Sequence, residues 1–181
     1  MTLKLKKINK EDIGQIMQWR MMPEVTKYMY TDPKLTVESQ LKWYKDISNN
    51  DEVKYWIIEF ENKKIGVINL YRIDDRNKRC FWAYYIGDTS FRGKGIARNL
   101  ECNLYDYVFY NLNLNKICCE VLEENDNVIR IHQKFGSKIE GKFREHIFKN
   151  NKFHNVVRMA ILKEEWDKIK SNYEYNKIEI D

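Results

Sequence analysis

A glycine-rich hexapeptide, Arg92-Gly93-Lys94-Gly95-Ile96-Ala97, is the part of this sequence best suited to do chemistry. It follows an aromatic, strand-like stretch from Cys80 to Gly87 and opens a segment with helical periodicity. A glycine turn between a strand and a helix presents unpaired backbone amides at the positive end of the helix dipole. Glycine also lets an anion approach the backbone closely, because it has no Cβ. The sequence therefore predicts a loop that binds a phosphate or pyrophosphate.

Two other kinds of phosphate loop are excluded by the residues at defined positions of this hexapeptide. A P-loop needs Ser or Thr directly after its Lys to bind magnesium, whereas Gly95 follows Lys94 here. A dinucleotide-binding fingerprint needs a third Gly or Ala at the right spacing and an acidic residue that closes the next strand, and the chain has neither. A tight connection between a strand and a helix, without a ligand, remains the alternative interpretation.

A mixed succession of helices and strands must position this loop. Apolar residues spaced three and four apart predict amphipathic helices at Glu11–Arg20, from the N-cap Thr36 to about Ile47, and after Gly95. Shorter helices are expected at 127–135, ended by a glycine, and around Trp166. The expected strands are 3–8, 53–60, 65–71, 79–87, 116–122, 137–148 and 153–162, the last two joined by an Asn150-Asn151 turn. The sequence thus predicts one mixed α/β domain without repeats or linkers.

Composition and charge limit the classes of protein to which the chain can belong. Its 181 residues, 43% of them hydrophobic, can bury a core without disulfides, and the four cysteines are expected to be reduced. The N-terminus has no apolar signal segment and no run is long enough to span a membrane, so we expect a cytoplasmic location and no membrane partner. The net charge of +5 is spread along the chain, which argues against a nucleic-acid partner. It fits anionic small molecules better than polyamines.

The hexapeptide resembles the Arg/Gln-x-x-Gly-x-Gly/Ala loop with which N-acetyltransferases of the GNAT superfamily hold the pyrophosphate of acetyl-coenzyme A. The order of the predicted elements is similar to that superfamily over nearly the whole chain. Asn125, followed by Arg130, Lys134, Phe135 and Gly136, resembles the family's block of Asn, a short helix and Lys-Leu-Gly-Phe. The resemblance implies one acetyltransferase domain at 1–170 and a polar tail at 171–181.

The same resemblance implies the fold and the place of the cofactor, acetyl-CoA. The family's α/β (α+β) fold has a mixed central sheet of about seven strands with helices on both faces. Two splayed parallel strands hold the cofactor between them like an additional strand, and in this chain they end near Ile86 and Leu122. The implied cofactor-binding residues are Ile86, Arg92, Gly93, Lys94, Gly95, Ile96, Ala97, Asn125 and Asn127.

Acetyl transfer to an amine needs a neutral amine, a hydrogen bond to the thioester oxygen and a proton for the leaving thiolate. The resemblance implies Glu120 as a base that acts through water, with an ordinary solvent-facing strand Glu as the alternative. It places His132 where most relatives have a Tyr that acts as the acid. His132 shares a helix face with Val128 and Phe135, so the alternative is a half-buried, hydrogen-bonded histidine. Tyr85 is a further candidate for the acid.

The start of the chain, Trp19-Arg20 with Pro23-Glu24-Val25, resembles the branch that contains ribosomal-protein N-terminal, spermidine and sugar-nucleotide acetyltransferases. Within this branch the chain is most similar to enzymes that acetylate a UDP-linked 4-amino-4,6-dideoxy sugar on the way to pseudaminic acid. The resemblance implies an N-acetyltransferase with a small amine acceptor, a nucleotide sugar, working as a monomer or homodimer. The implied acceptor-binding residues are Arg20, Lys27, Tyr30, Gln40, Trp43, Asn69 and Tyr71.

Several alternative functions stay open. One set of alternatives is an enzyme whose acceptor is a protein N-terminus, a polyamine or an antibiotic. Another is a non-catalytic acetyl-CoA-binding module, which the replacement of the usual Tyr by His132 leaves open. His146 and His154 fall on neighbouring strands of the last hairpin, which suggests a metal. No third ligand at the usual spacing accompanies them, so we expect no metal site and assign both histidines to the lining of the acceptor pocket.

Overall fold

The computed structural model describes residues 2–181 and divides them into two compact units. The first unit comprises residues 2–73, 83–94 and 178–181, and the second comprises residues 74–82 and 95–177. Over these described residues, no helix combines the length and the apolar character needed to span a membrane.

The described strands form one mixed sheet, whose hydrogen-bonded neighbours follow the order β6-β7-β5-β4-β3-β2-β1-β8. The predicted α/β fold with a mixed sheet is confirmed, and there are eight strands rather than about seven. The unpredicted strand is β8 (Glu179–Ile180), which pairs in parallel with β1. Two residues are too few for a periodic pattern, so the sequence carried no signal for it. The other strands are β1 (Leu3–Lys7), β2 (Lys54–Phe60), β3 (Lys63–Asp74), β4 (Arg79–Ile86), β5 (Lys116–Leu122), β6 (Lys138–Lys149) and β7 (Lys152–Leu162).

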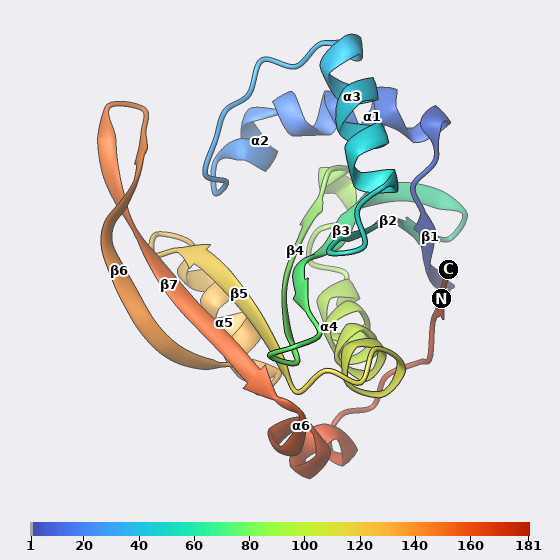
Figure 1. Ribbon diagram of the computed structural model, residues 1–181, viewed down its shortest axis with the longest axis vertical. Coiled ribbons are helices and arrows are strands. Elements are labelled where there is room, and N and C mark those ends of the chain that lie inside the picture. The colour runs from blue at the N-terminus through green and yellow to red at the C-terminus, as the bar shows by residue number, and fades with distance from the viewer. Residues whose placement is uncertain (1) are drawn as a thin grey trace. The chain divides into compact units, whose positions relative to one another are not determined.

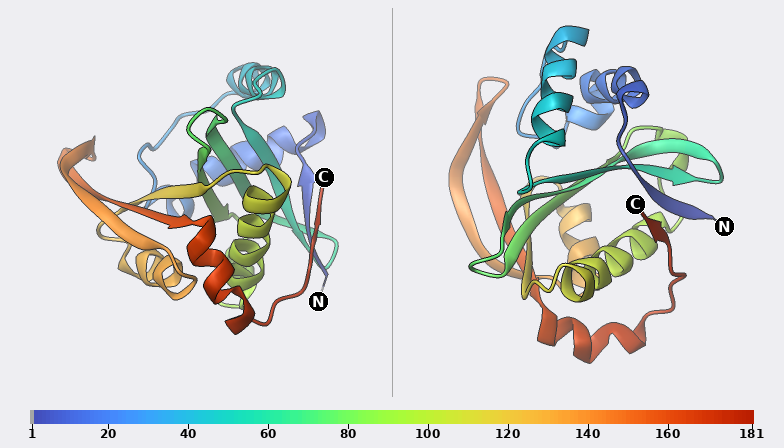
Figure 2. Two further views of the ribbon diagram at one scale, coloured as in Figure 1. Left: turned by 60° about the horizontal axis from the view of Figure 1, so that its bottom comes forward. Right: turned by 45° about the vertical axis from the view of Figure 1, so that its right-hand side comes forward.

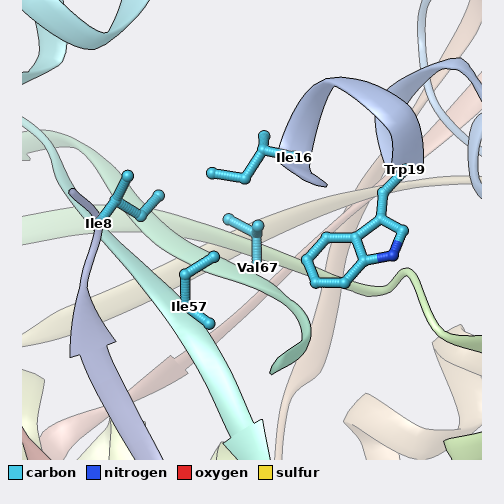
Figure 3. Close-up of a cluster of buried hydrophobic side chains, with 5 residues drawn as sticks. All are labelled: Ile8, Ile16, Trp19, Ile57 and Val67. Atoms are coloured by element: carbon cyan, nitrogen blue, oxygen red, sulfur yellow. The ribbon is translucent and has the colours of Figure 1, made fainter. Parts of the chain in front are cut away.

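In the first unit, helices α1 (Ile13–Met21) and α3 (Val37–Ser48) cover one face of strands β1 to β3 (Figure 2), and the short helix α2 (Pro23–Thr26) follows α1. Ile16 and Trp19 on α1 pack with Ile57 on β2, Val67 on β3 and Ile8, and all five side chains are buried (Figure 3). Ile16 and Trp19 lie three residues apart on one stripe of the helix, and Ile57 and Val67 come from consecutively buried stretches of their strands.

Reciprocal hydrogen bonds fix where the helices of the first unit begin. Thr36 Oγ1 accepts from the Ser39 amide at 3.1 Å and Ser39 Oγ accepts from the Thr36 amide at 3.0 Å, which confirms Thr36 as the N-cap of α3. The first predicted helix begins differently. Asn9 caps a 3₁₀ turn at Lys10–Asp12, and the α-helix starts only at Ile13. The Asn9 side chain accepts from the backbone ahead of it, a local bond that apolar periodicity does not reveal.

In the second unit, β6 and β7 form the long hairpin that extends from the rest of this unit in Figure 1. Its turn residues Asn150 and Asn151 have φ of +51° and +58°, so the predicted Asn-Asn turn is confirmed. β7 also pairs with β5 antiparallel, and β5 pairs with β4 in parallel over three residues of each strand. The helices of this unit are α4 (Ile96–Asp106), α5 (Asp126–Lys134) and α6 (Lys163–Ile169), and its cysteines are free.

The carboxylate of Asp106, at the end of α4, holds the C-terminal residues of the second unit. It accepts hydrogen bonds from Trp166 Nε1 at 2.9 Å and from the Tyr175 hydroxyl at 2.6 Å, and it pairs with Lys177. Burial raises the pKa of Asp106, but the bonds from Lys177, Tyr175 and Trp166 outweigh burial, so the pKa is lowered. The end of the second unit is therefore fastened by one buried acceptor.

We expect Asp106→Ala to lower the free energy of unfolding by about 2–3 kcal/mol, because the fully buried Trp166 N–H loses its acceptor. Urea unfolding followed by tryptophan fluorescence measures the change. Asp167→Ala is the matched control, since that carboxylate pairs with Lys163 at the surface and its loss should cost about 0.5 kcal/mol or less. Equal effects of the two substitutions would refute the role given to Asp106.

Candidate active site

The predicted phosphate loop is an exposed turn that leads directly into α4. Gly93 and Gly95 have φ of +77° and +73°, a backbone conformation that side chains with a Cβ rarely adopt. A Cβ at either position would meet no atom within 4 Å. The glycines are thus required by the backbone conformation, and not by the close approach of protein atoms. The amides of Gly93 and Gly95 form no hydrogen bond with any described part of the chain, so they are available to an anion.

Arg92, the first residue of the loop, has a structural role in the first unit. Its Nη2 atom donates to the carbonyl oxygens of Glu24 and Ile86, each at 3.1 Å. The indole of Trp19 lies against Gly87, where an added Cβ would come within 2.3 Å of the ring. These contacts tie the start of the loop to α2 and to the end of β4. The guanidinium of Arg92 is therefore already engaged, and the anion is left to the backbone amides and to the exposed Lys94.

The predicted cofactor residues that follow the loop in sequence lie in the second unit. Ile96 and Ala97 form the first turn of α4, where helix amides have no partner within the helix. Asn125 is the residue before α5, and its side chain makes no hydrogen bond within the described chain. Asn127 is exposed in the first turn of α5. These groups have free hydrogen-bonding capacity, and their contact with the cofactor stays a prediction.

Glu120, the candidate base, lies half-buried on β5 and is not a free carboxylate. Its Oε1 atom accepts from Arg158 Nη1 at 2.7 Å across the pair of strands β5 and β7. The Arg158 guanidinium in turn lies over the ring of Phe81, 4.0 Å from its centroid. The alternative of a solvent-facing strand Glu does not describe this residue. A base role requires the acceptor or its water to share Glu120 with Arg158.

His132, the candidate acid, is buried in the second unit, with only 4% of its surface exposed. Its Nδ1 atom lies 3.0 Å from Oε1 of Glu101, a fully buried residue on α4. Cys119 on β5 is close enough to raise the pKa of the imidazole, whose ring centroid lies 5.1 Å from that of Trp82. Burial lowers the pKa of His132, but Glu101 and Cys119 outweigh burial and raise the pKa to about 10. His132 is thus protonated at neutral pH, and more deeply enclosed than either sequence interpretation predicted.

Four residues of the first unit meet beside its core. Trp43 packs against Tyr55 with the ring centroids 5.3 Å apart, and both lie with Tyr85 at the buried cluster. Arg20 is close enough that its charge lowers the pKa of both phenols, although burial is the larger influence on each and raises the pKa. The Tyr85 hydroxyl is buried without a hydrogen-bond partner. Sequence reasoning predicted Arg20, Trp43 and Tyr85 here but missed Tyr55, whose position on β2 carried only a strand signal.

Arg20 supplies a positive charge that no carboxylate of the described chain neutralises. The half-buried guanidinium donates to Met29 Sδ and forms no ion pair. Lys27 is exposed, with Nζ 5.0 Å from the ring centroid of Tyr28, and it also lacks an ion pair in the described residues. The other predicted acceptor residues belong to the first unit as well, with Gln40 buried and Tyr30, Asn69 and Tyr71 half-buried. Of this predicted set, Arg20 and Trp43 belong to the cluster with Tyr55 and Tyr85.

The histidines of the last hairpin have separate surroundings. His154 Nδ1 lies 2.9 Å from Glu124 Oε1, whereas the exposed ring of His146 packs against Phe143 with centroids 5.1 Å apart. Within residues 2–181, no three His, Cys, Asp or Glu side chains gather in an arrangement able to hold a metal ion. The two histidines are thus not joined into a site.

The sequence of this chain is similar to those of known proteins. Residues 2–138 match the model of the Acetyltransferase (GNAT) domain. The chain is 28% identical to the spermidine N(1)-acetyltransferase of Escherichia coli K12, covering 91% of this chain and 88% of that protein. It is 26% identical to the acetyltransferase PseH of Campylobacter jejuni, covering 70% of this chain and 77% of that protein.

The fold agrees with a solved structure of the same kind. The crystal structure of spermidine N-acetyltransferase from Vibrio cholerae in complex with CoA and spermine superposes with a TM-score of 0.86. The sequence identity is 25%, and the match covers 91% of this chain and 98% of that one. The likeness therefore extends over most of both chains.

Proposed function

Because this chain belongs to the acetyltransferase (GNAT) family and is an acetyl-CoA-dependent N-acetyltransferase, we propose that it passes acetyl directly from the thioester to a primary amine of a small acceptor. The open glycine turn before α4 is the observation that carries this proposal. Its amides and the helix end would hold the pyrophosphate of acetyl-CoA, with Asn125 and Asn127 as further contacts. We also propose one domain over residues 1–170 and a monomer or homodimer in the cytoplasm.

The reaction needs no covalent enzyme intermediate when both substrates are bound together. The amine nitrogen forms a bond to the acetyl carbon, and the bond from that carbon to the CoA sulfur breaks. Glu120 would take the amine's proton through a water, and His132 would provide a proton to the departing thiolate. The Tyr85 phenol stays protonated because burial raises its pKa, so it is a second possible donor in the first unit.

The comparisons favour a polyamine as the acceptor. Relatives that cover 91% of this chain include the spermidine N(1)-acetyltransferases of Escherichia coli and Vibrio cholerae, and the superposed crystal structure contains spermine. A polyamine offers a primary amine on a flexible chain without anionic groups. This acceptor class was an alternative from the sequence and is now the first candidate to test.

One observation favours a second candidate, the amino sugar linked to a nucleoside diphosphate. Arg20 lies half-buried beside two phenols and has no carboxylate partner in the described chain. A cationic polyamine would be repelled by this guanidinium, whereas a phosphate or carboxylate would be bound by it.

Release of free CoA thiol, measured with spermidine, spermine, a UDP-linked 4-amino sugar and short peptides, tests the proposed function. Turnover with one class of small amine, at a kcat/KM at least about 100-fold above the others, would identify the acceptor. Turnover with peptides alone would contradict a small acceptor. Tight acetyl-CoA binding without any turnover would show a non-catalytic module.

The substitution Arg20→Gln separates the two candidate acceptors. For a nucleotide-linked sugar we expect KM to rise about 10- to 100-fold, because one charge-assisted hydrogen bond to an anion contributes about 1.5–3 kcal/mol. For a polyamine we expect KM to stay the same or to fall. Lys42→Gln, an exposed change on the solvent side of α3, is the control and should change neither KM. A large rise of KM for spermidine in Arg20→Gln would contradict this assignment of charge.

A further inference from the structure

A chain of buried polar side chains crosses the second unit from β5 to the start of β6. Cys119 lies near His132, and His132 Nδ1 donates to Glu101 Oε1 at 3.0 Å. The other carboxylate oxygen of Glu101 accepts from the Tyr105 hydroxyl at 3.1 Å, and that hydroxyl also lies 3.1 Å from Ser137 Oγ. We call these five residues the buried relay. Neither acetyl-CoA binding nor the acceptor site described above requires it.

An ionised pair at this depth carries a cost that apolar packing would avoid. Glu101 is fully buried and His132 nearly so, and taking two charges out of water is unfavourable for each ion. Every oxygen of the Glu101 carboxylate and the Nδ1 atom of His132 nevertheless have partners. A residue whose pKa is strongly shifted by burial together with a specific charged partner is a candidate for a functional role.

We propose that Glu101 is a positioning residue for acetyl transfer, which fixes the orientation of the His132 imidazole and holds it in the proton-donating form. The inference rests on the proposed function, in which His132 protonates the leaving thiolate. Glu101 itself touches no substrate and acts only through His132. The bond it forms fixes Nδ1 as the ring nitrogen that faces the carboxylate.

Among the groups around His132, Glu101 contributes most to holding the imidazole in its protonated form. The neighbouring elements contribute Glu101 and Tyr105 from α4, Cys119 from β5, Trp82 from β4 and Ser137 before β6. Trp82 and Ser137 carry no charge, and burial raises the pKa of Tyr105 so that it stays neutral. After burial, which lowers the pKa of His132, Glu101 is the largest influence and Cys119 follows.

The test is the pH profile of kcat for the wild type and for Glu101→Gln, which keeps the shape of the side chain and removes its charge. We expect the wild type to keep its kcat to pH 9 and to lose half of it near pH 10. In Glu101→Gln the imidazole should titrate closer to its ordinary value of about 6.5, so kcat should fall about 100-fold at pH 9 and much less at pH 6. Glu101→Asp should restore part of the activity at high pH.

Two variants and one spectroscopic readout separate positioning from a merely structural role. Ser137→Ala removes the last hydroxyl of the buried relay and should leave the alkaline limb of the profile in place. An NMR titration of the His132 ring follows its pKa without any activity. If the high-pH fall of kcat in Glu101→Gln moves together with the pKa measured by NMR, the proposal is supported. If the high-pH fall of kcat stays in place while the NMR pKa falls, the proposal is overturned. It is also overturned if that fall moves only in Cys119→Ser.

The NMR readout also keeps this inference distinct from the proposed function. If no amine is acetylated but the His132 pKa falls in Glu101→Gln, the proposed function has failed and the coupling within the buried relay stands, although its role in acetyl transfer is lost. If the wild type acetylates an amine but its kcat does not change with pH as His132 titrates, the proposed reaction stands and the positioning role is refuted.

Discussion

The double substitution Gly93→Val and Gly95→Val is expected to weaken acetyl-CoA binding by at least about 100-fold. Each glycine has a positive φ, where a residue with a Cβ is strained by about 1–2 kcal/mol and a β-branched one by more. Together they cost about 3 kcal/mol or more, and every 1.4 kcal/mol is a factor of ten in affinity. The turn would leave its conformation and its amides would no longer converge on the pyrophosphate. Isothermal titration calorimetry with acetyl-CoA measures the loss.

Two control substitutions make this prediction specific. Gly141→Ala adds a Cβ where nothing lies within 4 Å and where φ is not positive, so its affinity should equal that of the wild type. Gly93→Asn should lose much less than valine, because Asn enters the left-handed region more readily. If the double valine variant and Gly141→Ala both bound acetyl-CoA with the affinity of the wild type, the loop would not be the cofactor site.

The second large effect is expected from Gly66→Ala in β3 of the first unit. An added Cβ would lie 2.1 Å from the carbonyl oxygen of Tyr85 and 3.0 Å from Cα of Ile86. Both atoms are backbone, so relief requires a shift of β4 itself, and we expect a loss of about 3 kcal/mol in the free energy of unfolding. The phenol of Tyr85 would move as well, and a displacement of about 1 Å at a reacting site costs about 100-fold in rate.

Urea unfolding and the acetylation rate, compared with those of Gly14→Ala, provide the measurement. Gly14 is an exposed residue of α1 where an added Cβ meets no atom, so alanine there should stabilise the protein by about 0.5–1 kcal/mol. A Gly66→Ala protein as stable and as active as the wild type would mean that β3 and the end of β4 are not in close contact within the first unit.

Much of the fold followed from sequence because its signals are local. The alternating strands, the Thr36 cap and the Asn150-Asn151 turn each depend on residues that are neighbours in the chain. The sequence missed β8 because a two-residue strand is defined only by its partner. It also described residues 171–181 as a polar tail, whereas Tyr175 and Lys177 bind Asp106 and residues 179–180 pair with β1.

The candidate site was less predictable, because its partners are remote in sequence. The glycine turn was found from six consecutive residues. The contact between Glu120 and Arg158 spans 38 positions, and that between Glu101 and His132 spans 31. Glu101 lies on a helix whose pattern marks it as an ordinary polar position, so only the folded chain reveals it as a buried carboxylate. The charge of Arg20 says more about the acceptor than the sequence patterns do. Arg20 is therefore the residue whose substitution distinguishes the two candidate acceptors.

We propose above that the backbone amides of the loop at 93–97 hold the pyrophosphate of acetyl-CoA. The most direct measurement is an amide NMR titration of the wild type with acetyl-CoA and with acetyl-pantetheine, which has the thioester but no pyrophosphate. We expect the amide resonances of Gly93, Gly95 and Ile96 to shift with acetyl-CoA and to stay in place with acetyl-pantetheine. Saturating acetyl-CoA binding that leaves these three amides unshifted would contradict it.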